Sequence, residues 1–401
     1  MPHYRRVGEV PPKRHTQFRQ PDGRLYAEEL MSQEGFSFST SLLYHRESPT
    51  AIVKAEAVDE PVGADRAEPN HPLQPRLLHT HGLPAGGDLV GGRQLLLVNE
   101  DVRLSYAAGG SPSELYRNGV GDELVYVESG RAVLESVYGR LEVGQGDYVV
   151  VPTSTTHRWL PQGEVRALVV ESRGHVGPPA RYFTKYGQLK EGAPYCERDI
   201  HAPEEPLVVD DGEAQVLVRT RAGLTRFTYA HHPFDVVGWD GYVYPYRFSI
   251  HDFEPITGRI HQPPPVHQTF EAPGVVVCSF VPRLFDYDPL AVAVPYNHAN
   301  VDSDEVLFYV GGDFMSRKGA GIGMGSITLH PSGFVHGPQP GSVEAGLGKA
   351  ATDELAVMVD TFRPLRLGPA ALACEAPEYA WSWARREQAS GDGPAMPSMT
   401  D

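Results

Sequence analysis

The chain has 401 residues, and 35 Lys and Arg residues stand against 51 Asp and Glu residues, so the formal net charge is −16. This acidic balance disfavours a nucleic-acid-binding protein, which would carry a basic face. The three cysteines, at positions 196, 278 and 374, are far apart, which argues against a disulfide framework and favours a reducing compartment. No segment approaches the ~18 apolar residues of a membrane span, and the start lacks a signal-peptide run, so we expect a cytoplasmic protein without a membrane partner.

Short strands dominate the predicted secondary structure. The 42 Gly and 36 Pro residues interrupt helices, and between them lie short β-branched and aromatic runs that are typical of strands. In chain order these runs cover residues 94–98, 123–127, 131–137, 147–151, 167–171, 275–281, 306–310 and 355–359. Helical periodicity is confined to residues 25–31 and 377–385. The pattern predicts an all-β fold of the sandwich or barrel type with few short helices.

An internal repeat relates two parts of the chain. The pattern Tyr116-x-Asn118-(4)-Glu123-(6)-Gly130 recurs 182 positions later as His298-x-Asn300-(4)-Glu305-(6)-Gly312. A second pattern, Gly146-(5)-Pro152-x-Ser154-(2)-His157, recurs 179 positions later as Gly325-(5)-Pro331-x-Gly333-(2)-His336. Because a duplicated pattern indicates a duplicated structural unit, both halves should contain the same arrangement of strands.

These spacings resemble the two motifs of the cupin barrels, G-(5)-H-x-H-(3,4)-E-(6)-G and G-(5)-P-x-G-(2)-H, which hold a metal inside a small jelly-roll barrel. In the second half, His298, Glu305 and His336 stand at ligand positions of those motifs, and Asn300 replaces the second histidine of H-x-H. Two imidazoles and one carboxylate make the facial triad of non-haem Fe(II) oxygenases, which leaves positions open for substrate and O₂. The resemblance therefore implies Fe(II) as the cofactor.

The first half lacks most of these ligands. Tyr116 and Asn118 stand where ligand histidines would, which leaves Glu123 and His157. Two ligands rarely hold iron, so we expect a metal-free copy there. The resulting division is an N-terminal arm at 1–57, a metal-free cupin-like barrel at 58–205, a cupin barrel with the iron site at 206–383 and a disordered tail at 384–401.

Several segments resemble the homogentisate 1,2-dioxygenase family, two-domain iron enzymes that open the ring of 2,5-dihydroxyphenylacetate. Residues 25–30 (L-Y-A-E-E-L) are similar to the family's Y-A-E-Q-L, residues 295–300 (P-Y-N-H-A-N) to P-Y-Y-H-R-N, and residues 336–338 (H-G-P) to H-G-P. The resemblance implies conversion of homogentisate and O₂ to maleylacetoacetate in tyrosine and phenylalanine catabolism. It also implies a homo-oligomer, either a trimer or a hexamer.

The same resemblance nominates residues around the metal. His261 falls where the family has a histidine that acts as acid and base beside the iron, and imidazole suits that role because it titrates near neutral pH. His330 matches an active-site histidine that bonds the remote hydroxyl of the substrate. The remaining candidates for substrate binding are Tyr296 in the P-Y-N-H segment, Phe314 and Arg317 near the substrate carboxylate, and His267 where the family has a tyrosine.

Three alternatives stay open from the sequence. Asp304 rivals Glu305 as the carboxylate ligand, because Glu305 lies seven residues after His298 and the animal enzymes use six; Glu123 at the equivalent place of the first half favours Glu305. A gentisate-type ring dioxygenase shares the two-barrel frame but resembles sites with three histidines. The third alternative is a non-catalytic metabolite-binding protein with two cupin barrels. The intact triad argues against it, because such a protein does not need one.

Overall fold

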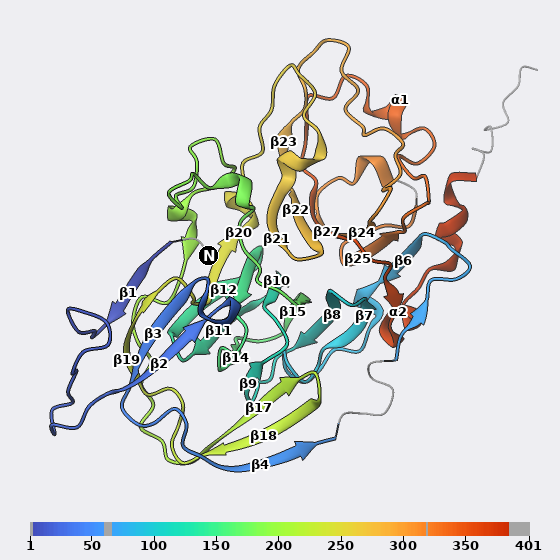
Figure 1. The fold of residues 1–401 in the computed structure, drawn as a ribbon. Helices are drawn as coiled ribbons and strands as arrows, with labels where there is room; N and C mark the ends of the chain where they lie inside the picture. Colours follow the sequence, from blue (N-terminus) through green and yellow to red (C-terminus); the bar gives the residue numbers. More distant parts are fainter. Residues whose placement is uncertain (1–2, 60–65, 318–319, 385–401) are drawn as a thin grey trace, which may run out of the picture.

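A computed structural model describes residues 3–59, 66–317 and 320–384 of the chain. Figure 1 shows a first half built from blue, green and yellow-green strands, and a second half of gold and orange strands beside it. The predicted all-β fold with two cupin halves is confirmed. None of the helices in the described ranges is long and apolar enough to cross a membrane.

The first half consists of two sheets that face each other. The larger has the order β16-β20-β13-β10-β15-β8-β7-β28-β5. Its strands are β5 (Glu68–Pro69), β7 (Gln94–Val98), β8 (Val102–Gly109), β10 (Glu123–Ser129), β13 (Asp147–Val151), β15 (Val165–Ser172), β16 (Ile200–His201), β20 (Tyr246–Ser249) and β28 (Arg366–Leu367). The other has the order β12-β11-β14-β9-β17-β18-β4. Its strands are β4 (Ile52–Val58), β9 (Leu115–Asn118), β11 (Arg131–Ser136), β12 (Gly139–Gly144), β14 (His157–Pro161), β17 (Ala214–Thr220) and β18 (Gly223–Tyr229).

Alternating side chains from both sheets fill the core of the first half. Val125 and Val149 from the larger sheet pack with Leu134 and Trp159 from the other, and Trp159 is completely buried. This is the arrangement expected of two sheets whose inner faces are apolar at every second position.

One sheet forms the framework of the second half. Its order is β21-β22-β27-β24-β25-β6. Its strands are β6 (Arg76–His79), β21 (Gln268–Ala272), β22 (Val275–Phe280), β24 (Asp304–Gly311), β25 (Ser326–His330) and β27 (Leu355–Thr361). One face packs on the first half, where the Phe308 ring lies 6.3 Å from Tyr106 and 6.2 Å from Tyr126. The other face carries Glu305, Leu307 and Tyr309 toward the interior of the second half, since side chains alternate along β24.

The remaining elements are short. A four-stranded sheet has the order β1-β19-β3-β2, and β23 pairs with β26. Their bounds are β1 (Arg5–Gly8), β2 (Ala27–Ser32), β3 (Thr40–His45), β19 (Val236–Gly241), β23 (Arg283–Leu284) and β26 (Ala351–Thr352). The α-helices are α1 (Ser342–Gly346) and α2 (Pro369–Ala373). The 3₁₀ helices are η1 (Glu34–Phe36), η2 (Thr80–Gly82), η3 (Ala180–Tyr182), η4 (Glu197–Asp199), η5 (Ile250–Asp252), η6 (Pro264–His267), η7 (Met315–Arg317) and η8 (Pro377–Ala384).

Each predicted strand run coincides with a strand, and the runs 131–137 and 275–281 extend one residue past the ends of β11 and β22. The helical prediction for residues 25–31 is wrong. Most of that segment is β2, which pairs along its whole length with β3. A segment of seven residues is too short for its periodicity to separate helix from strand, and pairing with the neighbouring strand decides its structure. The predicted helix near the C-terminus is confirmed as the 3₁₀ helix η8 up to Ala384. The tail expected at 384–401 lies outside the described residues from 385 onward.

Strands are exchanged between the two halves across the expected domain boundary at 205/206. That boundary stays a prediction. Strand β6 comes from the first part of the chain but forms the edge of the second half's sheet beside β25. In the other direction, β17 pairs with β9 and β20 pairs with β13. Each half therefore includes backbone from both sides of that boundary.

Candidate metal centre

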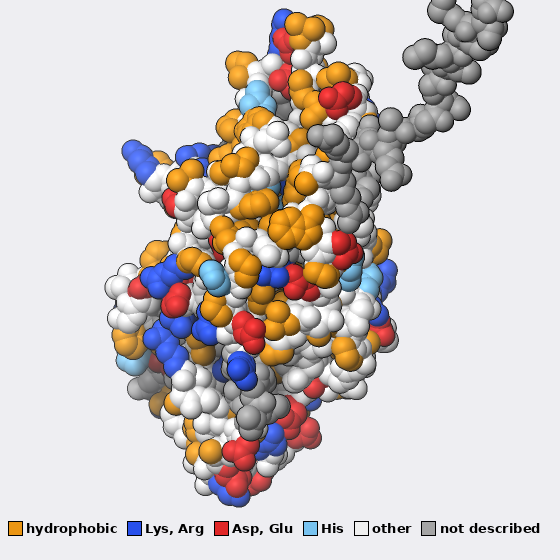
Figure 2. Space-filling model, turned by 90° about the vertical axis from the view of Figure 1, so that its right-hand side faces the viewer, with side chains coloured by type: hydrophobic (Ala, Val, Ile, Leu, Met, Phe, Trp, Pro, Cys, Tyr) orange, Lys and Arg blue, Asp and Glu red, His pale blue; other side chains and the backbone are white. Residues whose placement is uncertain are grey.

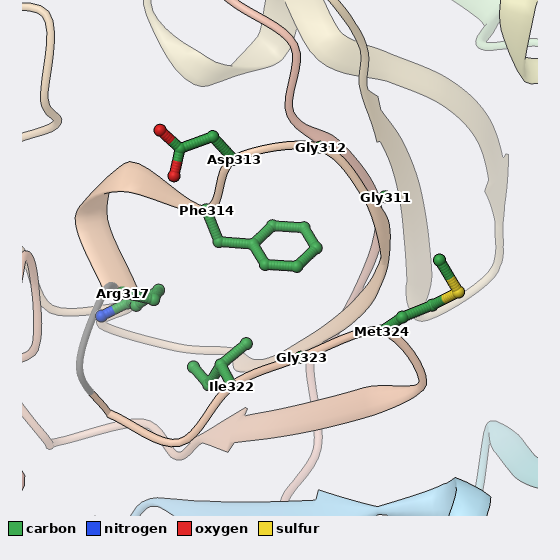
Figure 3. A pocket seen from close by; sticks show the side chains of 8 residues that line it. All are labelled: Gly311, Gly312, Asp313, Phe314, Arg317, Ile322, Gly323 and Met324. Carbon is green, nitrogen blue, oxygen red and sulfur yellow. The ribbon is translucent and has the colours of Figure 1, made fainter.

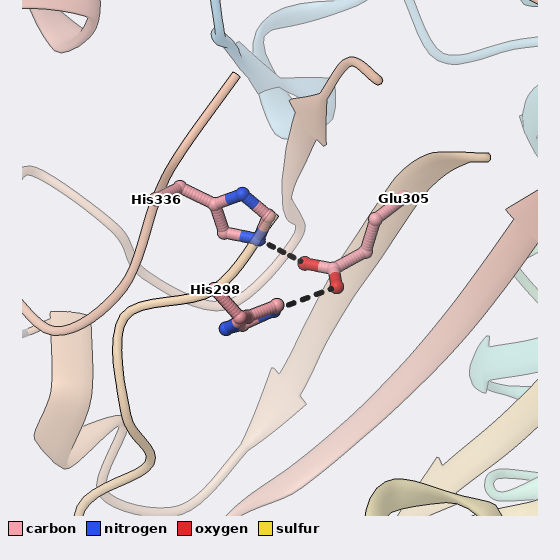
Figure 4. A group of neighbouring side chains, drawn as sticks. All are labelled: His298, Glu305 and His336. Carbon is pink, nitrogen blue, oxygen red and sulfur yellow. Dashed lines mark ion pairs between the residues drawn. The ribbon is translucent and has the colours of Figure 1, made fainter. Parts of the chain in front are cut away.

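Three side chains meet at one end of the second half's interior. The backbones of His298 and His336 pair through two hydrogen bonds, from His298 N to His336 O at 2.8 Å and from His336 N to His298 O at 2.9 Å. Glu305 projects from β24 toward both rings (Figure 4), with Nε2 of His298 3.6 Å and Nε2 of His336 3.3 Å from its carboxylate oxygens. One ligand atom from each residue lies within 4.8 Å of the others. The loops thus present two imidazoles to an acid on a rigid strand.

Backbone contacts set the orientation of both imidazoles. Nδ1 of His298 lies 3.1 Å from the carbonyl oxygen of Tyr296, and Nδ1 of His336 lies 3.3 Å from that of Phe334. Because a carbonyl oxygen only accepts, each ring donates through Nδ1–H, and the neutral form of each ring directs the lone pair of Nε2 toward Glu305. Nε2 of His336 is buried and has no hydrogen-bond partner in the described ranges. These donors fit a divalent transition metal that accepts nitrogen and oxygen ligands.

The charge of Glu305 is stabilised by its surroundings. Burial raises the pKa of this carboxyl group, but its contacts with the rings of His298, His330 and His336 outweigh burial and hold the pKa well below its usual value. The same carboxylate raises the pKa of His298. An ionised acid with two histidines competes poorly for protons once a cation is present, so a metal is the natural partner of this cluster.

A buried chain of hydrogen bonds holds Glu305 from behind. Nδ1 of His330 lies 2.9 Å from Oε1 of Glu305, and Nε2 of His330 lies 2.9 Å from the hydroxyl of Tyr379 on η8. Burial and the charge of Arg317 lower the pKa of His330 to about 3, so the ring is neutral, donates to the carboxylate and accepts from Tyr379. Both ring nitrogens have partners, and a substrate hydroxyl would have to displace one of them. The predicted contact of His330 with substrate stays a prediction.

The Tyr379 hydroxyl is expected to strengthen metal binding through this chain. Replacing Tyr379 with phenylalanine leaves Nε2 of His330 without its donor, which loosens the ring that positions Glu305. We expect roughly a 10-fold weaker affinity for Fe(II), measured by competition with a chelator under anaerobic conditions. Tyr287→Phe is the matched control, since Tyr287 is 68% exposed. An unchanged affinity in Tyr379→Phe, with the control also unchanged, would show that the chain has no influence on the metal.

The rival carboxylate Asp304 faces away from the cluster. Its Oδ1 accepts a hydrogen bond from the backbone N–H of Ser332 at 2.9 Å, and its Oδ2 accepts one from that of Leu365 at 2.8 Å. Adjacent residues of a strand point to opposite faces, so Asp304 and Glu305 cannot both reach the histidines. In the described part of the chain, Glu305 is the acid that lies with His298 and His336.

In the first half, an arginine side chain binds the acid at the motif position. Tyr116 and His157 pair across β9 and β14 as His298 and His336 do in the second half. The guanidinium of Arg93 donates to both oxygens of Glu123 at 2.8 Å each, whereas Nε2 of His157 is 4.0 Å from Glu123. This internal ion pair gives Glu123 a cationic partner within the chain, and the metal-free first half stays a prediction. The motif spacing did not reveal Arg93 because the residue lies outside both motifs, just before β7.

Two predicted substrate residues line a pocket at the other end of β24. The pocket has a volume of about 350 Å³ and contains Phe314 and Arg317 in its wall (Figure 3). The Phe314 ring packs 4.9 Å from Tyr309. Arg317 is buried, donates a hydrogen bond to the carbonyl oxygen of Gly337 and lies 6.0 Å from the Trp383 ring. The lining includes none of the three candidate ligands, but the contact with Gly337 links Arg317 to the loop that carries His336.

The other predicted substrate residues lie in two further places. The exposed rings of His261 and Tyr296 are 5.7 Å apart, and Tyr296 is 6.2 Å from His298, which places both on the solvent side of the cluster. His267 is buried against Phe280 at 4.5 Å, and burial followed by the charge of Arg283 lowers its pKa to about 3. The structure thus brings His261 and Tyr296 near the triad and leaves His267 as a buried neutral ring packed against Phe280.

Sequence reasoning missed Asp360, which lies beside the triad. Asp360 on β27 is the cross-strand partner of Glu305, and burial together with the charge of Glu305 raises its pKa to about 8. The signal was present, because alternation along β27 places Asp360 on the same face as Met358. Tyr379 was missed for a different reason, since no local pattern indicates that η8 docks beside β25.

Comparison with known proteins agrees with this geometry. A model of the cupin domain matches residues 102–171, which lie in the first half. "Putative dioxygenase SSO1533" of Saccharolobus solfataricus is 41% identical over 386 residues, which cover 95% of this chain and 98% of that protein. The chain belongs to the cupin dioxygenase family.

More distant relatives share less with this cupin dioxygenase. The homogentisate 1,2-dioxygenase of Emericella nidulans is 26% identical over 249 residues, which cover 59% of this chain and 54% of that protein. Among solved structures, the protein Ylba of E. coli matches 76% of this chain and 96% of its own with a TM-score of 0.33 and 9% identity. The relative from Saccharolobus solfataricus confirms the predicted assignment to a dioxygenase at the level of the enzyme class.

Proposed function

We propose that this cupin dioxygenase binds Fe(II) through His298, Glu305 and His336 and opens the ring of homogentisate or a close hydroquinone acid. The proposed product from homogentisate and O₂ is maleylacetoacetate, in tyrosine and phenylalanine catabolism. The observation that carries the proposal is the buried Nε2 of His336, which faces an ionised carboxylate at 3.3 Å and lacks a hydrogen-bond partner in the described ranges. Partial similarity to a homogentisate dioxygenase supports the choice of substrate.

The protein's own residues divide the work by position. Ferrous iron, when bound, supplies redox chemistry and two or three open positions where an aromatic hydroxyl and O₂ meet. We propose that His261, on the solvent side of Tyr296, accepts the proton that the substrate hydroxyl loses. Arg317 and Phe314 offer a cation and an aromatic wall, which suit the carboxylate arm and ring of an aryl acid. His267, Tyr296 and His330 remain proposed substrate contacts.

Oxygen uptake after anaerobic reconstitution with Fe(II) tests the proposal. We expect uptake with homogentisate and at least about tenfold slower uptake with gentisate, because a shorter carboxylate arm changes the reach between the metal and the cation. Faster uptake with gentisate would favour the gentisate-type alternative. If protein that has bound iron consumes no O₂ with any dihydroxyaryl acid, the chain is a non-catalytic binding protein and the proposal fails.

We also propose that the enzyme forms a trimer or hexamer in the cytoplasm. Apolar side chains lie exposed on the loops of the second half, including Leu290 at 90%, Val301 at 89% and Tyr287 at 68%. Figure 2 shows hydrophobic side chains gathered on the upper part of one face. Exposed apolar clusters of this kind are typical of surfaces that bind a partner, which supports a second copy of the chain as that partner. The three free cysteines are compatible with a reducing compartment.

A further inference from the structure

A row of polar side chains crosses the sheet at the level of the triad. Register pairs Glu305 with His330 on one side and with Asp360 on the other, and Asp360 in turn with Val276. Residues that pair across strands point to the same face, so Asp360 faces the same interior as Glu305. Oδ1 of Asp360 is buried and has no hydrogen-bond partner in any described segment. A buried polar atom without a partner costs free energy, and it calls for an explanation.

The first half shows what a structural role for this position requires. Glu171 is the cross-strand partner of Glu123, as Asp360 is of Glu305. Two arginines neutralise Glu171. The guanidinium groups of Arg93 and Arg103 each lie 3.3 Å from its carboxylate oxygens, and Arg103 is the cross-strand partner of Glu171 on β8. In the second half the position of Arg103 is taken by Val276, the cross-strand partner of Asp360. In the first half, Glu171 is thus paired with two arginines. In the second half, which has the triad, Asp360 lacks those two cations.

An apolar surface lies next to this acid. Cys278, Met358 and Leu307 form the adjacent cross-strand row on the same face, and all three are buried in one hydrophobic cluster. A molecule bound against this row meets apolar atoms over its body and polar groups along one edge. A planar ring with hydroxyl groups has that distribution of polarity, whereas an anionic group at the polar edge would be repelled by the ionised Glu305.

We propose that Asp360 is a substrate-binding residue that accepts a hydrogen bond from a second ring hydroxyl while the first occupies the metal. The proposal rests on the proposed function and specifies its substrate class: a phenol with two hydroxyl groups. A carboxyl group has an acceptor oxygen in either protonation state, so the contact does not depend on titration. Val276 at the position of Arg103 keeps that oxygen available for the ligand.

Ligand binding without turnover tests this assignment. Asp360→Leu and Asp360→Asn are loaded with Fe(II) anaerobically, their iron content is measured, and calorimetry gives Kd for 2,5-dihydroxyphenylacetate and for 2-hydroxyphenylacetate. We expect full iron content in both variants. In Asp360→Leu the affinity for the dihydroxy compound should fall roughly 10- to 100-fold, with little change for the monohydroxy compound. Asp360→Asn keeps an acceptor oxygen and should retain most of the affinity. The exposed Asp302 provides a matched control as Asp302→Asn.

Three outcomes would overturn the assignment, and they separate it from the proposed function. Loss of iron in Asp360→Asn would make Asp360 part of the metal site. Equal affinity of wild type and Asp360→Leu for the dihydroxy compound would remove the contact and leave the proposed function standing. If iron-loaded wild type binds neither compound, the proposed function fails and takes this substrate contact with it.

Discussion

Replacing Glu305 with glutamine is expected to release the metal and to abolish oxygen uptake. The substitution keeps the size of the side chain but removes the charge that two imidazoles face at 3.3 Å and 3.6 Å. Two neutral histidines alone hold a divalent ion weakly, because the carboxylate supplies the only negative ligand among the three. We expect iron content to fall from stoichiometric to background and kcat/KM to fall at least about 1,000-fold. Alanine at His298 or His336 should have the same effect on both measurements.

Controls for this experiment come from the chain itself. Glu123→Gln changes the equivalent acid of the first half, where Arg93 already supplies the cation, and it should leave the iron content unchanged. Asp304→Asn weakens contacts to backbone N–H groups and should lower the thermal midpoint rather than the iron content. If Asp304→Asn loses the metal while Glu305→Gln keeps it, the carboxylate of the triad has been assigned wrongly.

Replacing Arg93 with methionine is expected to lower the free energy of unfolding by about 3–5 kcal/mol without loss of iron. Arg93 is buried between Glu123 and Glu171, at 2.8 Å and 3.3 Å. Burial opposes ionisation of Glu123, but the charge of Arg93 outweighs burial and lowers the pKa of that carboxyl to about 2. Without the guanidinium, two acids remain buried without their shared cation. Urea unfolding followed by circular dichroism measures the change.

A double variant separates charge from packing at this position. Adding Glu123→Gln to Arg93→Met removes one uncompensated charge and should recover part of the lost stability, since a neutral amide is cheaper to bury than a carboxylate. Both variants should retain iron, because the triad of the second half shares no contact with Arg93. Unchanged stability in Arg93→Met would contradict the view that this arginine replaces a metal in the first half.

The sequence predicts the parts of this molecule that depend on local pattern. Strand runs such as 123–127 and 306–310 are nearly continuous stretches of β-branched, aromatic and aliphatic residues that end at turns, so their type is evident without a structure. The positions of His298, Glu305 and His336 follow from repeated spacing, because each motif fixes a strand, a turn and a side chain together. The turn of the G-(5)-P-x-G-(2)-H motif has the same backbone conformation in both halves. Ser154 has φ 67°, in the left-handed region that Gly333 occupies at φ 78°.

The missed features depend on contacts between distant segments. Arg93 reaches Glu123 because β7 and β10 belong to one sheet, and Tyr379 reaches His330 because η8 docks beside β25. No spacing rule places β6 on the edge of the second half's sheet, 247 residues before its partner at Ser326↔His79. Residues 25–31 illustrate the same limit, since pairing with β3 decides a segment whose own periodicity is ambiguous.

Anomalous diffraction at the iron edge, from crystals of protein loaded with Fe(II) without oxygen, tests the central claim most directly. We predict one peak per chain, about 2.0–2.2 Å from Nε2 of His298, Nε2 of His336 and a carboxylate oxygen of Glu305, and no peak beside Glu123 in the first half. A peak bound elsewhere, or crystals of loaded protein in which the three side chains surround no metal, would contradict this account.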